Sequence, residues 1–377
     1  MSKFRCFDNS PNGVEIDTFA VTTLPTKTSY DVGDTLDTTG IVVTATADGM
    51  TGNVASYCTF SPTTLSDIGT TAITVEYYDK TTTFNVTVDE PIGTLENTSW
   101  ARIQQVGAAG TGSQYWAVGD TKSITVAGTV GNLTVASQTM KVFVLGFNHN
   151  SVNGIYFQCF MKTNNGSNRK VVLYPPGGTG TRKTDGSKIF NMNHWGNNTY
   201  GGWAGCDMRY DILGSTDTPP SGYGSAAVSG RVGYDASSTT ATSPVPNTVM
   251  SILPSDLRAV MAPWTIYTDN VGTNGSAEHV TASVDYLPLL SEYETYQSTG
   301  WANTTEATYQ KQFDFYKNGG TKMVYAHDNL GNNTQQRFRS YDRYSSSQKF
   351  VVASSDGGRD SFYADMTTPI CSIFRVA

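Results

Sequence analysis

Three acidic residues lie close together in the last third of the chain: Asp285, Glu292 and Glu294. Two carboxyl groups that flank a glycosidic bond can hydrolyse it, so this group is a candidate for the hydrolysis of cell-wall glycans. Asp285, however, opens an apolar run, and Glu292 follows Ser291. This pattern is typical of helix caps and of buried carboxylates that accept hydrogen bonds from the backbone. We favour this structural interpretation over the catalytic one.

Other reactive residues show no catalytic or metal-binding spacing. Neither H-x-x-x-H, H-E-x-x-H nor G-x-S-x-G occurs. Asp356–Asp360 and Asp269-Asn270 offer oxygen ligands for calcium, but no further feature of the sequence supports a calcium site. The five cysteines are far apart and form no C-x-x-C pair, so we interpret them as free thiols that pack as small apolar groups. The histidines, which we interpret as structural, are His149, His194, His279 and His327. We therefore predict no enzymatic activity, no cofactor and no metal.

Aromatic residues in polar segments are the positive signal for binding. Flat amphipathic rings among Asn, Asp and Arg suit stacking on sugars or contact with proteins. Trp203 and Trp301 are expected to anchor the core instead. The candidate ligand-binding residues are Trp195, Asn197, Asn198, Tyr200, Tyr341, Asp342, Arg343 and Tyr344.

Composition indicates a mainly β protein. Only 15% of residues are charged, and Thr, Ser, Asn, Gly and Tyr are abundant, which favours strands and turns over long helices. The net charge of −7 argues against nucleic-acid binding, which needs clustered cations. No run approaches the roughly 20 apolar residues of a membrane-spanning helix, and the amino terminus lacks the apolar core of a secretory signal. We expect neither membrane insertion nor secretion by a signal peptide.

The first quarter of the chain predicts a small β-sandwich over residues 20–90. The run 41–47 ends at Asp48-Gly49, a strong hairpin signal, and residues 71–88 form a second hairpin with apolar residues at every other position. Residues 1–19 are interpreted as an arm that docks into a larger assembly or as a frayed terminus. Residues 91–96, with Pro and Gly, are the expected linker.

The segment from Leu24 to Val43 follows the theme L-P-x-K-T-x-Y-x-x-G-D-x-L-D-x-x-G-I-x-V. It resembles bacterial Ig-like domains of group 3. This resemblance implies a spacer of the kind found on bacterial surfaces and phage particles. The alternative is that this module itself binds a glycan or a receptor.

Residues 97–377 predict a second, β-rich domain with long loops and a few short helices. The low-complexity stretch near 215–248 is expected to be a loop insertion. The expected helical segments are 203–213, 250–262, 292–295 and 305–316.

An ordered set of motifs runs through this second part. Asp285–Glu294 reads D-x-L-x-L-L-S-E-x-E, Arg339-Ser340 follows, and Pro369–Val376 reads P-x-C-x-I-F-x-V. The set resembles a domain of unknown function found in gut-bacterial and prophage proteins, within the C-type lectin-like superfamily. That superfamily includes formylglycine-generating enzymes, but the cysteines here show no matching arrangement, so their activity is not carried over.

These observations predict a bacteriophage virion structural protein displayed on the particle, located in the virion and contacting host-surface glycans or proteins. We expect other virion proteins to bind the arm and the Ig-like domain, and we expect a homo-oligomer. Host attachment, as in a tail fiber, is the first hypothesis. The alternative is a capsid or tail decoration or assembly protein whose loops contact neighbouring subunits. A cell-wall glycan hydrolase is the third.

Overall fold

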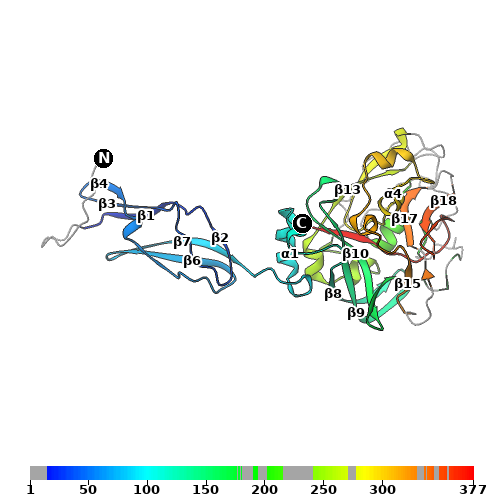
Figure 1. The fold of residues 1–377 in the computed structure, drawn as a ribbon, viewed down its shortest axis with the longest axis horizontal. Helices are drawn as coiled ribbons and strands as arrows, with labels where there is room; N and C mark the ends of the chain where they lie inside the picture. Colours follow the sequence, from blue (N-terminus) through cyan, green and yellow to red (C-terminus); the bar gives the residue numbers. More distant parts are fainter. Residues whose placement is uncertain are drawn as a thin grey trace. The chain divides into compact units, whose positions relative to one another are not determined.

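The computed structural model shows a mainly β chain that folds as two compact units (Figure 1). Unit 1 ends at Ile92 and unit 2 begins at Gly93, within the segment 91–96 in which the sequence predicts a linker. For residues 278, 335–336 and 338–343 only the backbone is described. The described residues are 15–175, 177–178, 180, 190–193, 202–214, 241–270, 277–328, 335–336, 338–343, 348–354 and 356–377.

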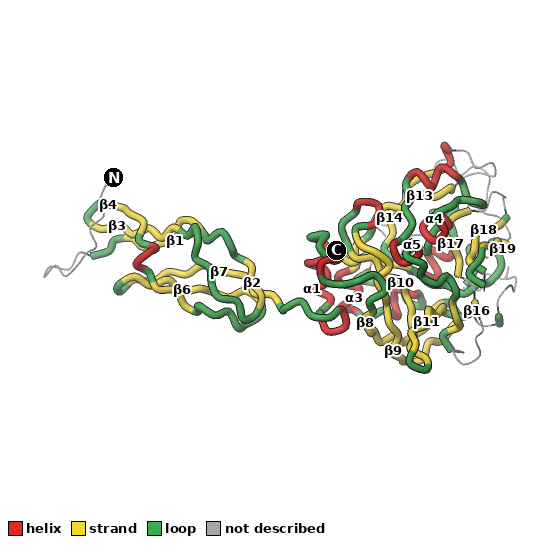
Figure 2. The backbone as a smooth tube through the Cα atoms, in the orientation of Figure 1, coloured by secondary structure: helices red, strands yellow, loops and turns green. Residues whose placement is uncertain are grey.

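Unit 1 consists of two sheets that share one apolar core (Figure 2). One sheet has the strand order β1-β3-β4, and the other has the order β2-β7-β6-β5. The strands are β1 (Thr18–Thr23), β2 (Ser29–Asp31), β3 (Val42–Ala47), β4 (Met50–Asn53), β5 (Thr59–Ser61), β6 (Gly69–Tyr77) and β7 (Lys80–Asp89).

Buried apolar residues alternate with exposed residues along β6 and β7, and this pattern explains how the two strands cover one core. Ile73 and Val75 on β6 are buried, as are Phe84 and Val86 on β7, while the residues between them are exposed. The predicted hairpin with one buried face is therefore confirmed. The predicted Asp48-Gly49 turn is also confirmed: it joins Ala47 to Met50, and both of its residues have positive φ, the geometry that favours Gly and Asp.

The start of unit 1 differs from the predicted boundary at residue 20. Strand β1 already begins at Thr18, and the backbone N–H of Asp17 donates to the carbonyl oxygen of Thr46. Ile16 is only 7% exposed and belongs to the core. Residues 16–19 are thus part of the sandwich, because burying Ile16 stabilises it. Residues 1–14 of the predicted arm lie outside the described residues.

Strand β10 (Ile155–Asn164) is the centre of the main sheet of unit 2. It pairs with β9 (Leu133–Phe147) on one side, and with β20 (Ile373–Val376) and then β11 (Ser167–Val172) on the other. The sheet is completed by β8 (Thr121–Val130), β12 (Met261–Ala262), β15 (Val324–Ala326) and β16 (Gln335–Gln336). The strand β10 residues 155–161 are all buried, so this strand carries much of the core.

Two smaller sheets lie beside the main one. Strands β13 (Trp264–Asp269) and β14 (Val280–Asp285) form a hairpin. The second small sheet has the order β17-β18-β19, in which β17 is Phe338–Arg343, β18 is Lys349–Ala353 and β19 is Arg359–Tyr363.

Short helices connect these strands, partly as predicted. Helix α4 (Glu292–Tyr296) matches the expected segment 292–295. The segment 250–262 divides into α2 (Val249–Ile252) and α3 (Ser255–Val260), because Pro254 cannot continue the first helix. The segment 305–316 likewise divides into a 3-10 helix, Thr304–Thr308, and α5 (Asp314–Lys317), and 203–213 is helical only as the π-helix Met208–Leu213.

Helix α1 (Trp100–Ala108) is not among the helical segments that the sequence predicts. The sequence nevertheless contains two features typical of a helix. Ser99 caps it by accepting from the backbone N–H of Arg102, and the spacing of Trp100, Ile103 and Val106 places them on its buried side. The helix lies against β20, where Gly107 faces the carbonyl oxygen of Val376. Both ends of unit 2 therefore meet at α1, and β15, β17 and β18 lie at the opposite end (Figure 1).

No helix in the described ranges is both long and apolar enough to cross a membrane.

Candidate functional site

Of the predicted ligand-binding residues, Trp195, Asn197, Asn198, Tyr200 and Tyr344 lie outside the described residues. The structure therefore gives no account of their position, and their role stays a prediction.

Tyr341, Asp342 and Arg343 lie in strand β17, not in the loop that the sequence indicates. The register shifts between Arg339 and Arg343, where β17 has two more residues than its partner strand β18. Such a bulge interrupts the ladder of backbone hydrogen bonds and bends the strand. Because β17 is an edge strand of its sheet, the bulge places these three residues on an irregular sheet edge.

Asp285 lies in a buried network and not in a cleft. It accepts hydrogen bonds from Arg209 Nε at 2.6 Å and from Trp203 Nε1 at 3.0 Å. Burial acts to lower the pKa of Arg209, but the Asp285 carboxylate, together with Tyr210 and Cys206, acts in the opposite direction, and the pKa of Arg209 is raised. Trp203 is fully buried, which confirms its predicted role as a core anchor, and Trp301 is partly buried.

Glu292 and Glu294 accept hydrogen bonds from the backbone, as the structural interpretation predicts, whereas the hydrogen-bond donors to Asp285 described above are side chains. Glu292 is 1% exposed, and its Oε2 accepts from the N–H groups of Trp301 and Ala302, while its Oε1 lies 2.8 Å from Arg359 Nε. Glu294 accepts from the N–H of Ser291 in the capping box of α4. The predicted caps and backbone ties are confirmed. Carboxylates bound in this way lack the open space that a glycan and a water molecule would need.

His149 belongs to the same buried region. Its ring stacks on Phe313 with 3.7 Å between centroids, and its Nε2 lies 3.2 Å from Glu294 Oε1. These contacts agree with the structural role expected for this histidine. His194 lies outside the described residues.

The described thiols are poor nucleophiles. Cys58, Cys159, Cys206 and Cys371 are free, as expected, and all but Cys58 are buried. Burial raises the pKa of Cys206 and Cys371 to about 12, so both are protonated near neutral pH. No group of three or more His, Cys, Asp or Glu side chains that could hold a metal ion occurs among the described residues.

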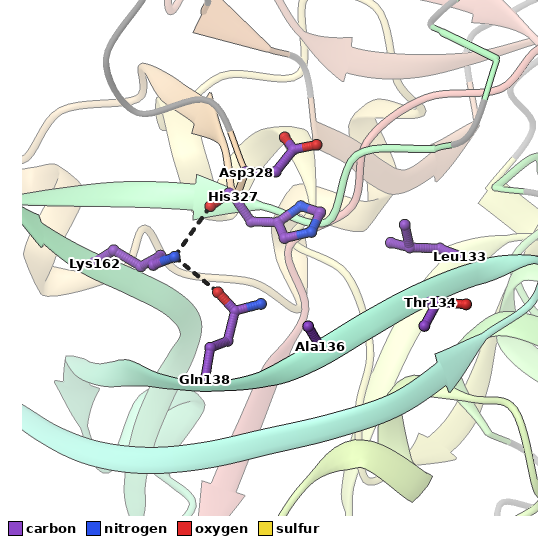
Figure 3. A pocket seen from close by; sticks show the side chains of 7 residues that line it. All are labelled: Leu133, Thr134, Ala136, Gln138, Lys162, His327 and Asp328. Carbon is purple, nitrogen blue, oxygen red and sulfur yellow. Dashed lines mark hydrogen bonds between the residues drawn. The ribbon is translucent and has the colours of Figure 1, made fainter.

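A pocket of about 400 Å³ lies in unit 2 between β9, the end of β10 and the turn after β15 (Figure 3). Lys162 lines it, and its Nζ donates to Gln138 Oε1 at 2.7 Å and to the carbonyl oxygen of His327 at 3.2 Å. Its lining residues are Leu133, Thr134, Ala136, Gln138, Lys162, His327 and Asp328.

His327 is held as a neutral imidazole. Its Nδ1 accepts a hydrogen bond from the backbone N–H of Tyr174 at 3.3 Å, which leaves the proton on Nε2. Burial lowers the pKa of His327, with a further lowering by Lys162, although Asp328 opposes it. The ring therefore offers a hydrogen-bond donor near neutral pH.

The sequence does not predict this pocket. Its motifs indicate only a structural role for His327 and no role for Gln138, Lys162 or Asp328. The residues come from segments up to 195 positions apart (133 to 328), and no local spacing brings them together.

Comparison with known protein families identifies unit 1. A model of the bacterial Ig-like domain (group 3) matches residues 23–88, which include the Leu24–Val43 theme, strands β2 to β6 and all but the last residue of β7. A comparison with curated protein sequences finds none that matches the chain. The two-sheet core, the hairpin turns and the family match agree, and residues 23–88 are a bacterial Ig-like domain of group 3.

Proposed function

We propose that this chain is a structural protein displayed on a bacteriophage particle, and that its unit 2 contacts glycans or proteins of the host surface. The observation that carries the proposal is the bacterial Ig-like domain joined to a separate, larger unit. Domains of this kind are stable β-sandwiches that space one module from another. The motifs of residues 97–377 support the second half of the proposal, because they resemble a C-type lectin-like domain of prophage proteins.

The arrangement of unit 2 also supports a binding role. Strand β20 packs against α1 at one end of unit 2, and β15, β17 and β18 lie at the opposite end (Figure 1). The irregular edge strand β17, with Tyr341 and Arg343, lies there. Tyrosine and arginine are residue types whose side chains stack on sugars.

Two measurements test the proposal. Antibodies against the purified protein should label phage particles in electron micrographs, and the purified chain should bind whole host cells or a glycan array. The double variant Tyr341→Ala/Arg343→Ala should bind at least tenfold less. Tyr57→Ala, which removes an exposed ring from unit 1, should bind as the wild type does. Unlabelled particles would refute the virion assignment, and unchanged binding by the double variant would refute the role of β17.

The alternative, a decoration or assembly protein, predicts a different image of the particle. In that case the end of unit 2 that carries β17 would be covered by neighbouring subunits. Host-surface recognition requires that this end faces solvent.

A further inference from the structure

The pocket beside Lys162 has its polar groups fixed before any ligand arrives. Lys162 Nζ is held by Gln138 Oε1 and by the carbonyl oxygen of His327, and the backbone N–H of His327 donates to Val172 O at 3.1 Å. With Nδ1 also engaged, the imidazole has one defined orientation. A site fixed in this way loses little conformational freedom when it binds, which favours even a weakly interacting ligand.

The side chains that line the pocket carry no net charge near pH 7. Lys162 contributes one positive charge and Asp328 one negative charge, while His327 is neutral near pH 7. A phosphate or sulfate would be repelled by Asp328, and a purely apolar molecule would leave the polar groups without partners, which is costly. The lining therefore selects a neutral, polar ligand.

The pocket lining contains both hydrogen-bond donors and hydrogen-bond acceptors. Lys162 and the Nε2–H of His327 donate, the Asp328 carboxylate accepts, and the Thr134 hydroxyl does both. A ligand that carries many hydroxyl groups satisfies such a mixture, because each hydroxyl can donate and accept.

The remaining surface is apolar and open. Leu133 and Ala136 provide aliphatic contacts from β9, on the side of the pocket opposite His327 (Figure 3). Thr134, Ala136 and Asp328 are exposed, so the pocket opens to solvent. Its volume of about 400 Å³ lies within the range of roughly 300–1,000 Å³ that small-molecule sites occupy, and it admits a sugar ring.

We propose that this pocket binds a neutral pyranose unit of a glycan, with Asp328 and Lys162 on its hydroxyl groups and Leu133 and Ala136 against its C–H face. The inference rests on the proposed recognition of glycans by unit 2, and it assigns a ligand class and a position that are independent of β17.

The test uses the full chain and saturation-transfer NMR with the methyl pyranosides of glucose, galactose, mannose and N-acetylglucosamine. Glucose 6-phosphate and glucuronate serve as charged comparisons. Ala136→Trp should fill the pocket, and Asp328→Asn should weaken binding about tenfold or more, since a hydrogen bond to a charged group is lost. Asp67→Asn, which changes an exposed carboxylate of unit 1, is the matched control and should bind as the wild type does.

The outcomes separate this inference from the proposed function. Binding of a neutral pyranoside that both pocket variants reduce supports the inference. If the wild type binds cells or a glycan array but both variants bind equally well, the pocket assignment is wrong and the proposed function stands. Preferential binding of glucose 6-phosphate would overturn the neutral ligand class. If the wild type binds neither cells nor any glycan, glycan recognition itself is refuted.

Discussion

The buried side chain of Lys170 makes the stability of unit 2 depend on pH in a predictable way. Lys170 is 1% exposed, and its Nζ donates to the Tyr316 hydroxyl at 2.8 Å and to the carbonyl oxygen of Thr321 at 3.0 Å. Burial lowers the pKa of Lys170 to about 7; Cys371 opposes this lowering, and Lys322 adds to it.

The size of the effect follows from this shift. Between pH 7 and about 10.4, the usual lysine pKa, the unfolded chain binds more protons than the folded one, so the free energy of unfolding rises with pH. The slope approaches about 1.4 kcal/mol per pH unit. Because Lys170 is already half-deprotonated in the folded state at pH 7, the rise from pH 7 to pH 8.5 is about 1.5 kcal/mol. Lys170→Met removes this contribution.

The assay is urea denaturation at pH 7 and pH 8.5, followed by tryptophan fluorescence. All six tryptophans lie after residue 92, so the signal reports on unit 2. From pH 7 to pH 8.5 the free energy of unfolding of the wild type should rise by about 1.5 kcal/mol relative to that of Lys170→Met. Lys317→Met, at an exposed position on α5, should show no such shift. A shift near zero for Lys170→Met would refute the reasoning and show that Lys170 is charged in the folded protein.

Three further substitutions test individual contacts. Arg209→Met should destabilise unit 2 by about 3–5 kcal/mol, because it leaves the Asp285 carboxylate buried without its cation; additional Asp285→Asn should recover part of this loss in urea denaturation, and no recovery would contradict the ion-pair argument. Gly49→Ala should lower the stability of unit 1 by about 1 kcal/mol, seen by calorimetry, because Gly49 has a φ of +74°. Gly107→Ala should destabilise unit 2 by about 1–3 kcal/mol, since its methyl group would meet the Val376 carbonyl oxygen; unchanged amide exchange in β20 would show that α1 shifts freely.

Local sequence patterns were sufficient to predict the fold of unit 1. Its alternating strands and the Asp48-Gly49 turn are set by side chains that are close in the sequence, and the structure and the family match agree with them. The predicted start of the sandwich at residue 20 was too late. Ile16 belongs to the core because it packs with residues far along the chain, and the sequence near Ile16 does not show this. In unit 2 the capping box at Ser291 and Glu294 was likewise readable, since it depends on two residues three positions apart.

The sequence by itself therefore determined a mainly β chain, an Ig-like domain near its start and carboxylates used as structural ties. Only the tertiary structure decided that Tyr341–Arg343 lie on a bulged edge strand, because a bulge depends on the register with β18. It alone brought Gln138, Lys162 and His327 together around one pocket. Sheet pairing joins residues that are distant in the sequence, and no local spacing encodes which of them will meet.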